Sequence, residues 1–152
     1  MFIRDSTNMK KETQAGFSLI ELLLVVVIIG IIAAVAFPWL NKAKLSAENS
    51  SAIATLSLMR QNQVVYFSQN QRFGTLQQIN DLHGNLGTVA SGTPNTLTQK
   101  AYEYTLTTPT DISRQYVITA TRIRDNAPLF VFNMNETGTI ARVLPTAGSP
   151  DN

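Results

Sequence analysis

A long uninterrupted apolar segment near the N-terminus constrains the fold of this chain most. Residues 22–37 include no charged or polar side chain and are rich in leucine, isoleucine and valine. Residues 17–40 would form a helix about 36 Å long, which is enough to cross a bilayer core of about 30 Å. Because the segment is apolar all round, its whole circumference has to leave water. The sequence therefore predicts a membrane-spanning helix at this position.

A single carboxylate, Glu21, lies at the start of this apolar segment. A carboxylate costs about 2.5–3.5 kcal/mol at the centre of a bilayer, so a compensating partner is expected. Cleavage between Gly16 and Phe17 would supply one, because the new α-amine has a pKa of about 7.7–8.0 and is cationic. Glu21 lies four residues beyond Phe17 and could pair with that amine within one helix or between neighbouring helices. This pairing favours many such helices packed side by side with a stagger.

Two other interpretations of the segment remain open. In the first, it is an uncut single-span anchor and the chain begins at Met1, which leaves Glu21 without a partner. In the second, it is a secretory signal cleaved after Ala36, which would release an exported soluble binding domain beginning at Phe37. The second fits less well, because the hydrophilic part of the signal would be about 21 residues long and would include an acidic residue.

The residues around the possible cut resemble the N-terminal motif of type IV pilins and type II secretion pseudopilins. The motif consists of a glycine before the cut, then Phe-Ser-Leu-Ile and a glutamate as the fifth mature residue, followed directly by the apolar run. This is a specific signal, much stronger than a two-residue pattern. The matching residues are Lys10 and Lys11 in a hydrophilic leader, Gly16, Phe17, Ser18, Leu19, Ile20, Glu21, Gly30 and Pro38.

The resemblance implies a processing route and an assembly. An aspartic leader peptidase would remove the leader peptide, residues 1–16, at the cytoplasmic face, and the same enzyme would N-methylate Phe17. Glu21 would pair with the methylated amine of an adjacent subunit, and Pro38 would mark a kink or a stretch of melted helix. The implied product is a helical protein filament, either a type IV pilus (fimbrium) or a type II secretion pseudopilus.

The same resemblance implies partners and a location. The partners would be further copies of the chain, other pilin-like subunits, the prepilin leader peptidase and methylase, and the inner-membrane assembly machinery. Lys10 and Lys11 precede the span, which by the positive-inside rule places the N-terminus in the cytoplasm. The precursor would cross the bacterial inner membrane once, in contact with the lipid bilayer. It would then join a filament in the periplasm or at the cell surface.

The residues that follow the span suggest a membrane interface. Lys42 and Lys44 are interpreted as a collar of the helix at that interface rather than as a binding site. Trp39 is either an interfacial anchor or part of the packing where the stalk meets the head.

After Pro38 the pattern changes from wholly apolar to amphipathic. Residues 17–40 are therefore expected to form a transmembrane or filament-core helix, and residues 41–70 an amphipathic helix that continues it to about Gln69. The polar side of the second part would carry Lys42, Lys44, Glu48, Asn49, Arg60 and Asn62. The apolar stripe, which should lie against a sheet, comprises Leu45, Ala52, Leu56, Met59 and Tyr66, with Ile53 beside them.

Residues 71–152 are expected to form a globular head with a loop and an antiparallel sheet. Residues 75–79 could form one helical turn with Thr75 near its cap, and residues 81–100 are expected to be a surface loop because glycine and proline recur there. The fold class is α+β, a long N-terminal helix packed at its C-terminal half against three to four strands. The strand-like runs are residues 101–107, 115–123, 129–134 and 139–144.

The composition argues against catalysis and ligand binding. The chain has no cysteine, a formal charge of only +2 and no Lys/Arg cluster interleaved with aromatic residues, so no direct nucleic-acid site is expected. His83 is the single histidine, and no nucleophile motif or phosphate-binding loop is present. We therefore expect no enzyme activity, no cofactor, no catalytic residue and no metal site. Five side chains offer oxygen ligands, but their spacing fits turns better. They are Asp125, Asn126, Asn133, Asn135 and Glu136.

Overall fold

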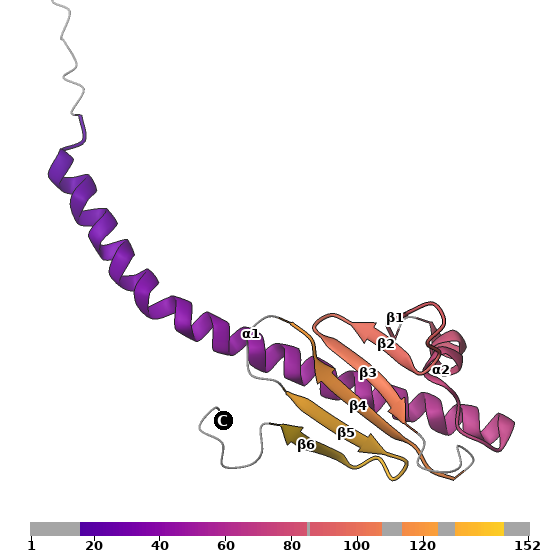
Figure 1. Ribbon diagram of the computed structural model, residues 1–152. Coiled ribbons are helices and arrows are strands. Elements are labelled where there is room, and N and C mark those ends of the chain that lie inside the picture. The colour runs from indigo at the N-terminus through magenta and orange to yellow at the C-terminus, as the bar shows by residue number, and fades with distance from the viewer. Residues whose placement is uncertain (1–15, 85, 108–113, 125–129, 145–152) are drawn as a thin grey trace, which may run out of the picture. The chain divides into compact units, whose positions relative to one another are not determined.

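The computed structural model describes residues 16–84, 86–107, 114–124 and 130–144 of the chain. It has a long helix α1 (Leu19–Asn70), a short helix α2 (Leu76–His83) and six strands (Figure 1). The chain divides into two compact units that meet between Asn41 and Lys42, and the second unit is called the head below. The strands, all in the head, are β1 (Thr88–Val89), β2 (Thr96–Gln99), β3 (Tyr102–Thr107), β4 (Val117–Arg122), β5 (Val131–Asn135) and β6 (Ile140–Leu144).

The strands form one antiparallel sheet in which each strand pairs with the next one along the chain, from β1 to β6. Side chains alternate between the two faces, because successive residues of a strand point to opposite sides. One row across the buried face contains Leu97, Tyr104, Ala120 and Phe132. The neighbouring row on the opposite face contains Thr96, Thr105, Thr119 and Asn133, so that face is largely polar.

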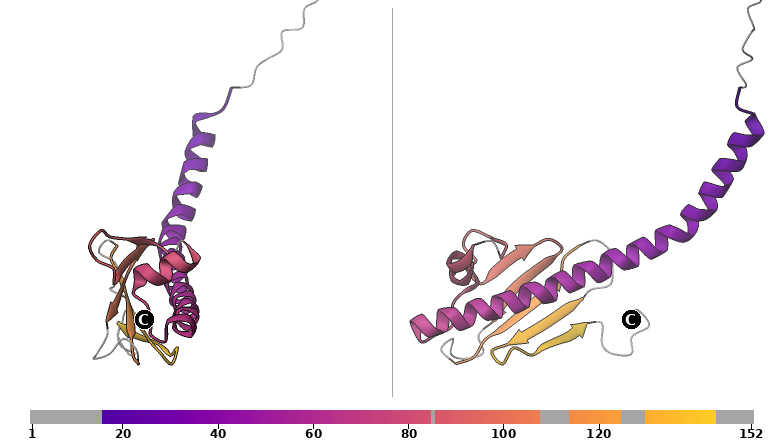
Figure 2. Two further views of the ribbon diagram at one scale, coloured as in Figure 1. Left: turned by 90° about the vertical axis from the view of Figure 1, so that its right-hand side faces the viewer. Right: turned by 180° about the vertical axis from the view of Figure 1, so that it is seen from behind.

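The part of α1 that belongs to the head lies along one face of the sheet (Figure 2). Its apolar stripe is buried there as predicted, with Leu56 and Met59 fully enclosed and Leu45 packed against the edge of the core. Ile53, which was expected beside the stripe, is 39% exposed. The α+β class is confirmed, and the helix ends at Asn70, one residue beyond the predicted end.

The sheet has two more strands than the predicted maximum of four. Strands β1 and β2 and the last turn of α2 lie within residues 81–100, which the sequence assigned to a loop. That prediction was wrong because β2 has only four residues and buries only Leu97 fully, so its apolar pattern is weak. Its place in the sheet depends instead on pairing with β3, which no local pattern reveals.

The short helix α2 confirms the predicted cap and extends beyond the single turn expected. The Thr75 side chain accepts a hydrogen bond from the Gln78 amide at 3.2 Å, and the Gln78 side chain accepts one from the Thr75 amide at 3.0 Å. This reciprocal pair is a capping box, which satisfies two amides at the start of a helix. The capping box explains why a helix of only eight residues forms here.

A buried amide connects α1 to the start of α2. The Gln63 side chain is fully buried, and its Nε2 donates to the Gly74 carbonyl at 2.7 Å. The Gly74 amide donates back to Gln63 Oε1 at 2.8 Å. Gln63 therefore satisfies both polar groups of one buried peptide segment, and it is retained in the apolar core for that reason.

Replacing Gln63 with alanine is expected to lower the free energy of unfolding by about 2–5 kcal/mol. The substitution leaves the Gly74 N–H and C=O buried without partners, at about 1–3 kcal/mol for each group. Thermal unfolding of the full chain in detergent, followed by circular dichroism, measures the loss. Gln77, an exposed residue of α2, is the matched control, and Gln77→Ala is expected to change stability by less than about 0.5 kcal/mol.

An ion pair holds the N-terminal part of the head helix to the sheet. Arg122 on β4 donates from Nη2 and Nε to Glu48 Oε2 at 2.7 and 3.1 Å, and only 13% of the Glu48 side chain is exposed. Beside this pair, the Tyr102 hydroxyl donates to Asn49 Oδ1 at 2.5 Å, and burial raises the pKa of Tyr102 to about 12. The phenol therefore stays protonated and remains a donor at neutral pH.

These contacts correct the predicted polar side of the helix. Glu48, Asn49 and Asn62 were assigned to the polar side, but each contacts the sheet or α2. Their partners come from β3, β4 and α2, which are far away in sequence. A helical wheel shows which side of a helix is polar. It cannot distinguish a carboxylate in water from one that is paired with a residue of the sheet.

Removal of the Glu48 charge is expected to weaken the head in a pH-dependent manner. The hydrogen bond from Arg122 holds the pKa of Glu48 below its ordinary value of 4.5. Above about pH 4.5 both the folded and unfolded states carry the carboxylate, so the stabilisation is fully present. As the pH falls through the lowered pKa, the unfolded state binds the proton first and the stabilisation is lost.

Glu48→Gln is accordingly expected to lower the free energy of unfolding by about 1.5–3 kcal/mol at pH 7. The difference between the native chain and the variant should shrink as the pH falls below 4.5. Unfolding curves between pH 3 and 7 measure it. A difference that stays constant over this range would show that the charge of Glu48 is not the source of the stabilisation.

Candidate functional site

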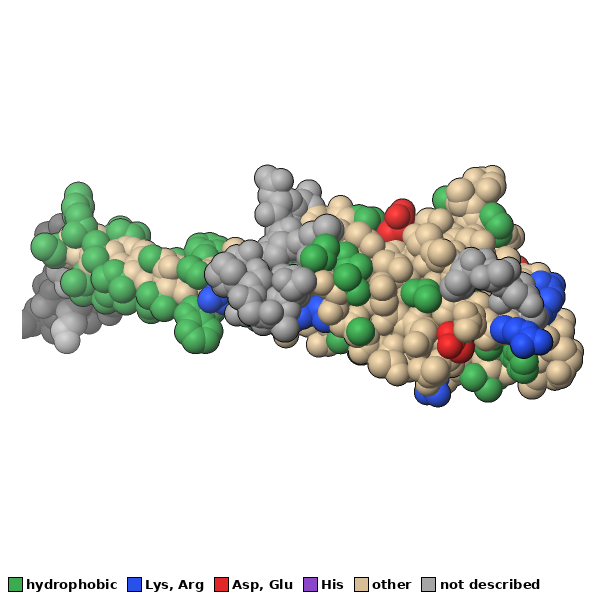
Figure 3. Space-filling model, turned by 60° about the horizontal axis from the view of Figure 1, so that its bottom comes forward, with side chains coloured by type: hydrophobic (Ala, Val, Ile, Leu, Met, Phe, Trp, Pro, Cys, Tyr) green, Lys and Arg blue, Asp and Glu red, His purple; other side chains and the backbone are tan. Residues whose placement is uncertain are grey.

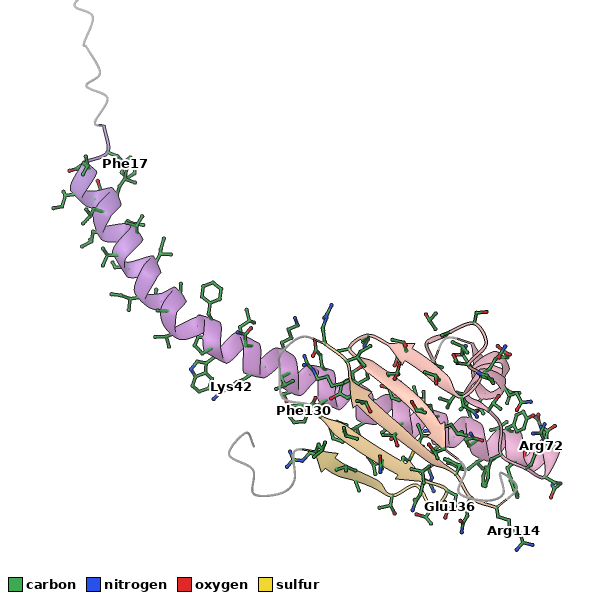
Figure 4. All side chains as sticks on the ribbon, in the orientation of Figure 1. Phe17, Lys42, Arg72, Arg114, Phe130 and Glu136 are labelled. Carbon is green, nitrogen blue, oxygen red and sulfur yellow. The ribbon has the colours of Figure 1, made fainter. Side chains whose placement is uncertain are left out.

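The possible cleavage point lies in non-helical chain directly before α1. Gly16, Phe17 and Ser18 precede the helix, which begins at Leu19. The amides of Glu21 and Leu22 both donate to the Ser18 carbonyl, at 3.1 and 3.3 Å, so Ser18 is where helical hydrogen bonding starts. Phe17 is 80% exposed and stands clear of the ribbon (Figure 4). The peptide bond between Gly16 and Phe17 therefore lies outside the helix in the described part of the chain.

Glu21 occupies the first turn of α1. A negative charge there is favoured by the helix dipole, at about 0.3–1 kcal/mol. Its side chain is exposed, and among the described residues both ion pairs belong to Glu48. The helix dipole alone is too weak to offset the cost of a carboxylate in an apolar environment, which is about 2.5–3.5 kcal/mol at a bilayer centre.

The apolar half of α1 is uncovered. Its most apolar window of 18 residues has a mean hydropathy of 3.1, and none of that window is buried. Figure 3 shows hydrophobic side chains along much of the visible surface of this segment. The helix is long and apolar enough to cross a membrane, and a surface of this kind requires lipid or other helices around it.

Pro38 lies inside α1, which is helical on both sides of it. The neighbouring Phe37, Trp39 and Leu40 are all exposed. The kink or melting expected at Pro38 stays a prediction, because it concerns the assembled filament. Gly30, the other motif residue within the helix, has no neighbouring atom within 4 Å of the position that a Cβ would take.

Among the oxygen-bearing side chains singled out in the sequence, Asn135 serves a turn, whereas Asn133 lies within strand β5 and not in a turn. Asn135 Oδ1 accepts a hydrogen bond from the Thr137 hydroxyl at 2.7 Å, and the Asn135 carbonyl accepts one from the Gly138 amide at 2.9 Å. Within the described residues no group of three His, Cys, Asp or Glu side chains could hold a metal ion. Asp125, Asn126 and the side chain of His83 lie outside the described part of the chain.

An exposed apolar helix that begins just after the Gly-Phe-Ser-Leu-Ile-Glu motif and continues into an α+β head is the arrangement expected of a pilin-like protein. Comparison with protein families agrees, because the family described as the prokaryotic N-terminal methylation motif matches residues 12–37. This match covers the end of the expected leader peptide, the possible cleavage point and the apolar segment. This match and individual relatives support the resemblance to the type IV pilin and type II secretion pseudopilin family that was predicted from the motif.

Three curated relatives carry names from the two branches of that family. Over 82 residues, the chain is 33% identical to the type II secretion system core protein G of Aeromonas hydrophila, covering 54% of this chain and 57% of the relative. It is 41% identical over 58 residues to the type IV major pilin protein PilA of Myxococcus xanthus, covering 38% and 26%. It is 30% identical over 70 residues to the core protein G of Klebsiella michiganensis, covering 46% and 49%. The chain thus spans about half or less of the length of these relatives.

Proposed function

We propose that this chain is the precursor of a structural filament subunit, a pilin or pseudopilin, and not an enzyme. In this proposal it is cleaved after Gly16, N-methylated at Phe17 and polymerised into a type IV pilus or a type II secretion pseudopilus. The observation that carries the proposal is the uncovered apolar helix directly behind the motif. Such a helix has two physically acceptable environments, a bilayer before assembly and a bundle of like helices after it.

The proposed partners follow from these two environments. Before assembly the helix spans the bacterial inner membrane with its N-terminus in the cytoplasm, where a leader peptidase and methylase acts on the junction. Assembly machinery in the same membrane then transfers the subunit to a filament of identical and related subunits. The relatives named as core proteins of type II secretion and as a major pilin support both kinds of filament.

Within the filament, we propose that Glu21 pairs with the methylated α-amine of Phe17 on a neighbouring subunit. The exposed position of both residues at the start of α1 leaves them free to contact another copy. Pairing replaces two separate charges in apolar surroundings with one neutral pair, which favours the staggered arrangement. Pro38 would allow α1 to bend or melt locally as the helices pack, because a proline removes one helical hydrogen bond.

Mass spectrometry of the N-terminal peptide, recovered from protein in the producing cells, tests this function. A peptide that begins at Phe17 and carries one methyl group supports the proposal. A chain that begins at Phe37 would instead indicate an exported soluble domain cut after Ala36, and a chain that retains Met1 an uncut anchor. Either of these two results would contradict the filament-subunit function.

A further inference from the structure

Basic side chains gather at the end of the head where α1 enters it. Lys42 and Lys44, on the helix, are both exposed, and Lys42 is labelled in Figure 4. Arg124, just beyond β4, has 55% of its side chain exposed. In Figure 3, Lys or Arg side chains lie at this end of the head. We call Lys42, Lys44 and Arg124 the cationic collar.

The carboxylates of this region do not neutralise the collar. Glu48 is already paired with the buried Arg122 at 2.7 Å, whereas Arg124 is 3.6 Å from its other oxygen. Lys100 donates to Ser51 Oγ at 2.9 Å, and in a simple count its charge cancels that of Glu103 on β3. Asp125 follows Arg124 in the sequence and lies outside the described residues, but a positive surplus remains even when its charge is counted.

The position of the two lysines along the helix matches the depth of a lipid headgroup layer. Lys42 and Lys44 follow Trp39 by three and five residues, or about 4.5 and 7.5 Å along a helix. A headgroup layer is about 5–8 Å thick on each side of a bilayer core of about 30 Å. Trp39 is 73% exposed, and tryptophan is enriched at the boundary between this layer and the core. The lysine ammonium groups would therefore lie among the headgroups when the apolar helix spans the bilayer.

The distribution of the charges around the helix favours a membrane over a protein partner. Two residues correspond to about 200° of rotation on an α-helix, so Lys42 and Lys44 lie on nearly opposite sides. A docked protein contacts one side of a helix, whereas a bilayer surrounds it. Charges on opposite sides of the helix, within one headgroup layer, therefore fit a lipid surface best.

We propose that the cationic collar binds anionic phospholipid headgroups in the leaflet next to the head. The inference rests on the proposed function, because it requires that the precursor spans a bilayer before assembly. It adds a preference for lipid charge on the side of the membrane opposite Lys10 and Lys11. The contact would hold the head close to the membrane until the subunit leaves for the filament, where the headgroups have to be exchanged for protein.

Trp39 provides a direct test because it is the single tryptophan of the chain. The full chain is inserted into vesicles of phosphatidylcholine with about 30% phosphatidylglycerol, and bromine is placed on the acyl chains of one lipid or the other. Quenching of Trp39 fluorescence then gives the association constant of phosphatidylglycerol relative to phosphatidylcholine. We expect this ratio to be several-fold above one at low salt, up to about five-fold for each cation that contacts the surface.

High salt and charge variants make the test specific. At about 1 M NaCl the screening length falls to about 3 Å, and the ratio is expected to approach one. Lys42→Gln combined with Lys44→Gln should also lower the ratio, by up to about five-fold for each lysine removed, without changing insertion. The matched control is Arg72→Gln combined with Arg114→Gln, which removes the same charge at the opposite end of the head (Figure 4) and should leave the ratio unchanged.

Two results would overturn the proposal. One is a ratio near one for the native chain at low salt, and the other is an equal loss in the lysine and arginine variants. Neither result bears on the filament-subunit function, which is decided by the N-terminal residue recovered from cells. Conversely, a chain found cut after Ala36 would remove the span, and with it the basis for both proposals.

Discussion

Replacing Glu21 with alanine is expected to leave cleavage after Gly16 intact and to reduce filament yield by at least 100-fold. In the native assembly the proposed partner of Glu21 is the methylated amine of Phe17 on a neighbouring subunit. Alanine removes the carboxylate but not the amine, which then enters the helix bundle as an unpaired cation. Loss of one partner from a buried pair costs about 3–5 kcal/mol, and every 1.4 kcal/mol is a factor of ten in an association constant.

The measurement combines two readouts from the same cells. The N-terminal residue of the membrane-bound protein reports cleavage, and the mass of sheared or pelleted filaments reports assembly. Glu21→Asp keeps the charge with a shorter reach and should retain part of the yield. Glu103→Ala, which removes a carboxylate from the polar face of the sheet, is the matched control and should assemble normally. Normal yield from Glu21→Ala would disprove the pairing.

The junction and the helix were accessible from the sequence because their signals are local. The apolar run predicts the helix directly. Its amphipathic continuation predicts that the helix ends at about Gln69, and in the structure it ends at Asn70. Strand β3 was expected at residues 101–107 and extends over Tyr102–Thr107. Each of these predictions depends on a pattern that lies within a single element, and such a pattern survives folding.

The features that the sequence did not reveal depend on contacts between distant segments. Glu48 and Arg122 are 74 residues apart, and only the sheet topology brings them together. Gln63 appears in the sequence as one more polar helix residue, yet it is buried to satisfy Gly74. Likewise, β2 is a strand because β3 offers it hydrogen-bonding partners. Polarity patterns predict which apolar residues are buried. They do not predict which polar residues are buried together with a hydrogen-bonding partner.

The candidate site at the N-terminal end of α1 differs from the head because its proposed partners are not part of the single chain. Phe17 and Glu21 are exposed, and so is almost every side chain of the apolar helix. An isolated soluble protein would not keep such a surface in water, since large exposed apolar patches mark interaction sites. The structure of the single chain therefore supports the interpretation of the motif, because it leaves the apolar helix uncovered.

Replacing Gly16 with leucine is expected to block processing, so that no protein of mature length accumulates. A Cβ at Gly16 would meet no atom within 4 Å, so the substitution leaves the described fold unchanged. Any loss of cleavage then reflects recognition by the peptidase, which has to accept the residue before the cut. The uncut chain keeps the hydrophilic residues 1–16 and has no free amine at Phe17. We therefore expect filament yield to fall below detection, together with processing.

Gly30→Leu separates this effect from a general intolerance of bulk in the apolar helix. Gly30 also has no neighbour within 4 Å of a Cβ position, but it lies fourteen residues beyond the cut. Cleavage of the Gly30→Leu chain should match that of the native chain in a gel that resolves precursor from mature protein. Mature-length protein in the Gly16→Leu strain would contradict cleavage at this bond. It would also remove the origin of the Phe17 amine, and the assembly argument built on Glu21 would then have no cation to pair with.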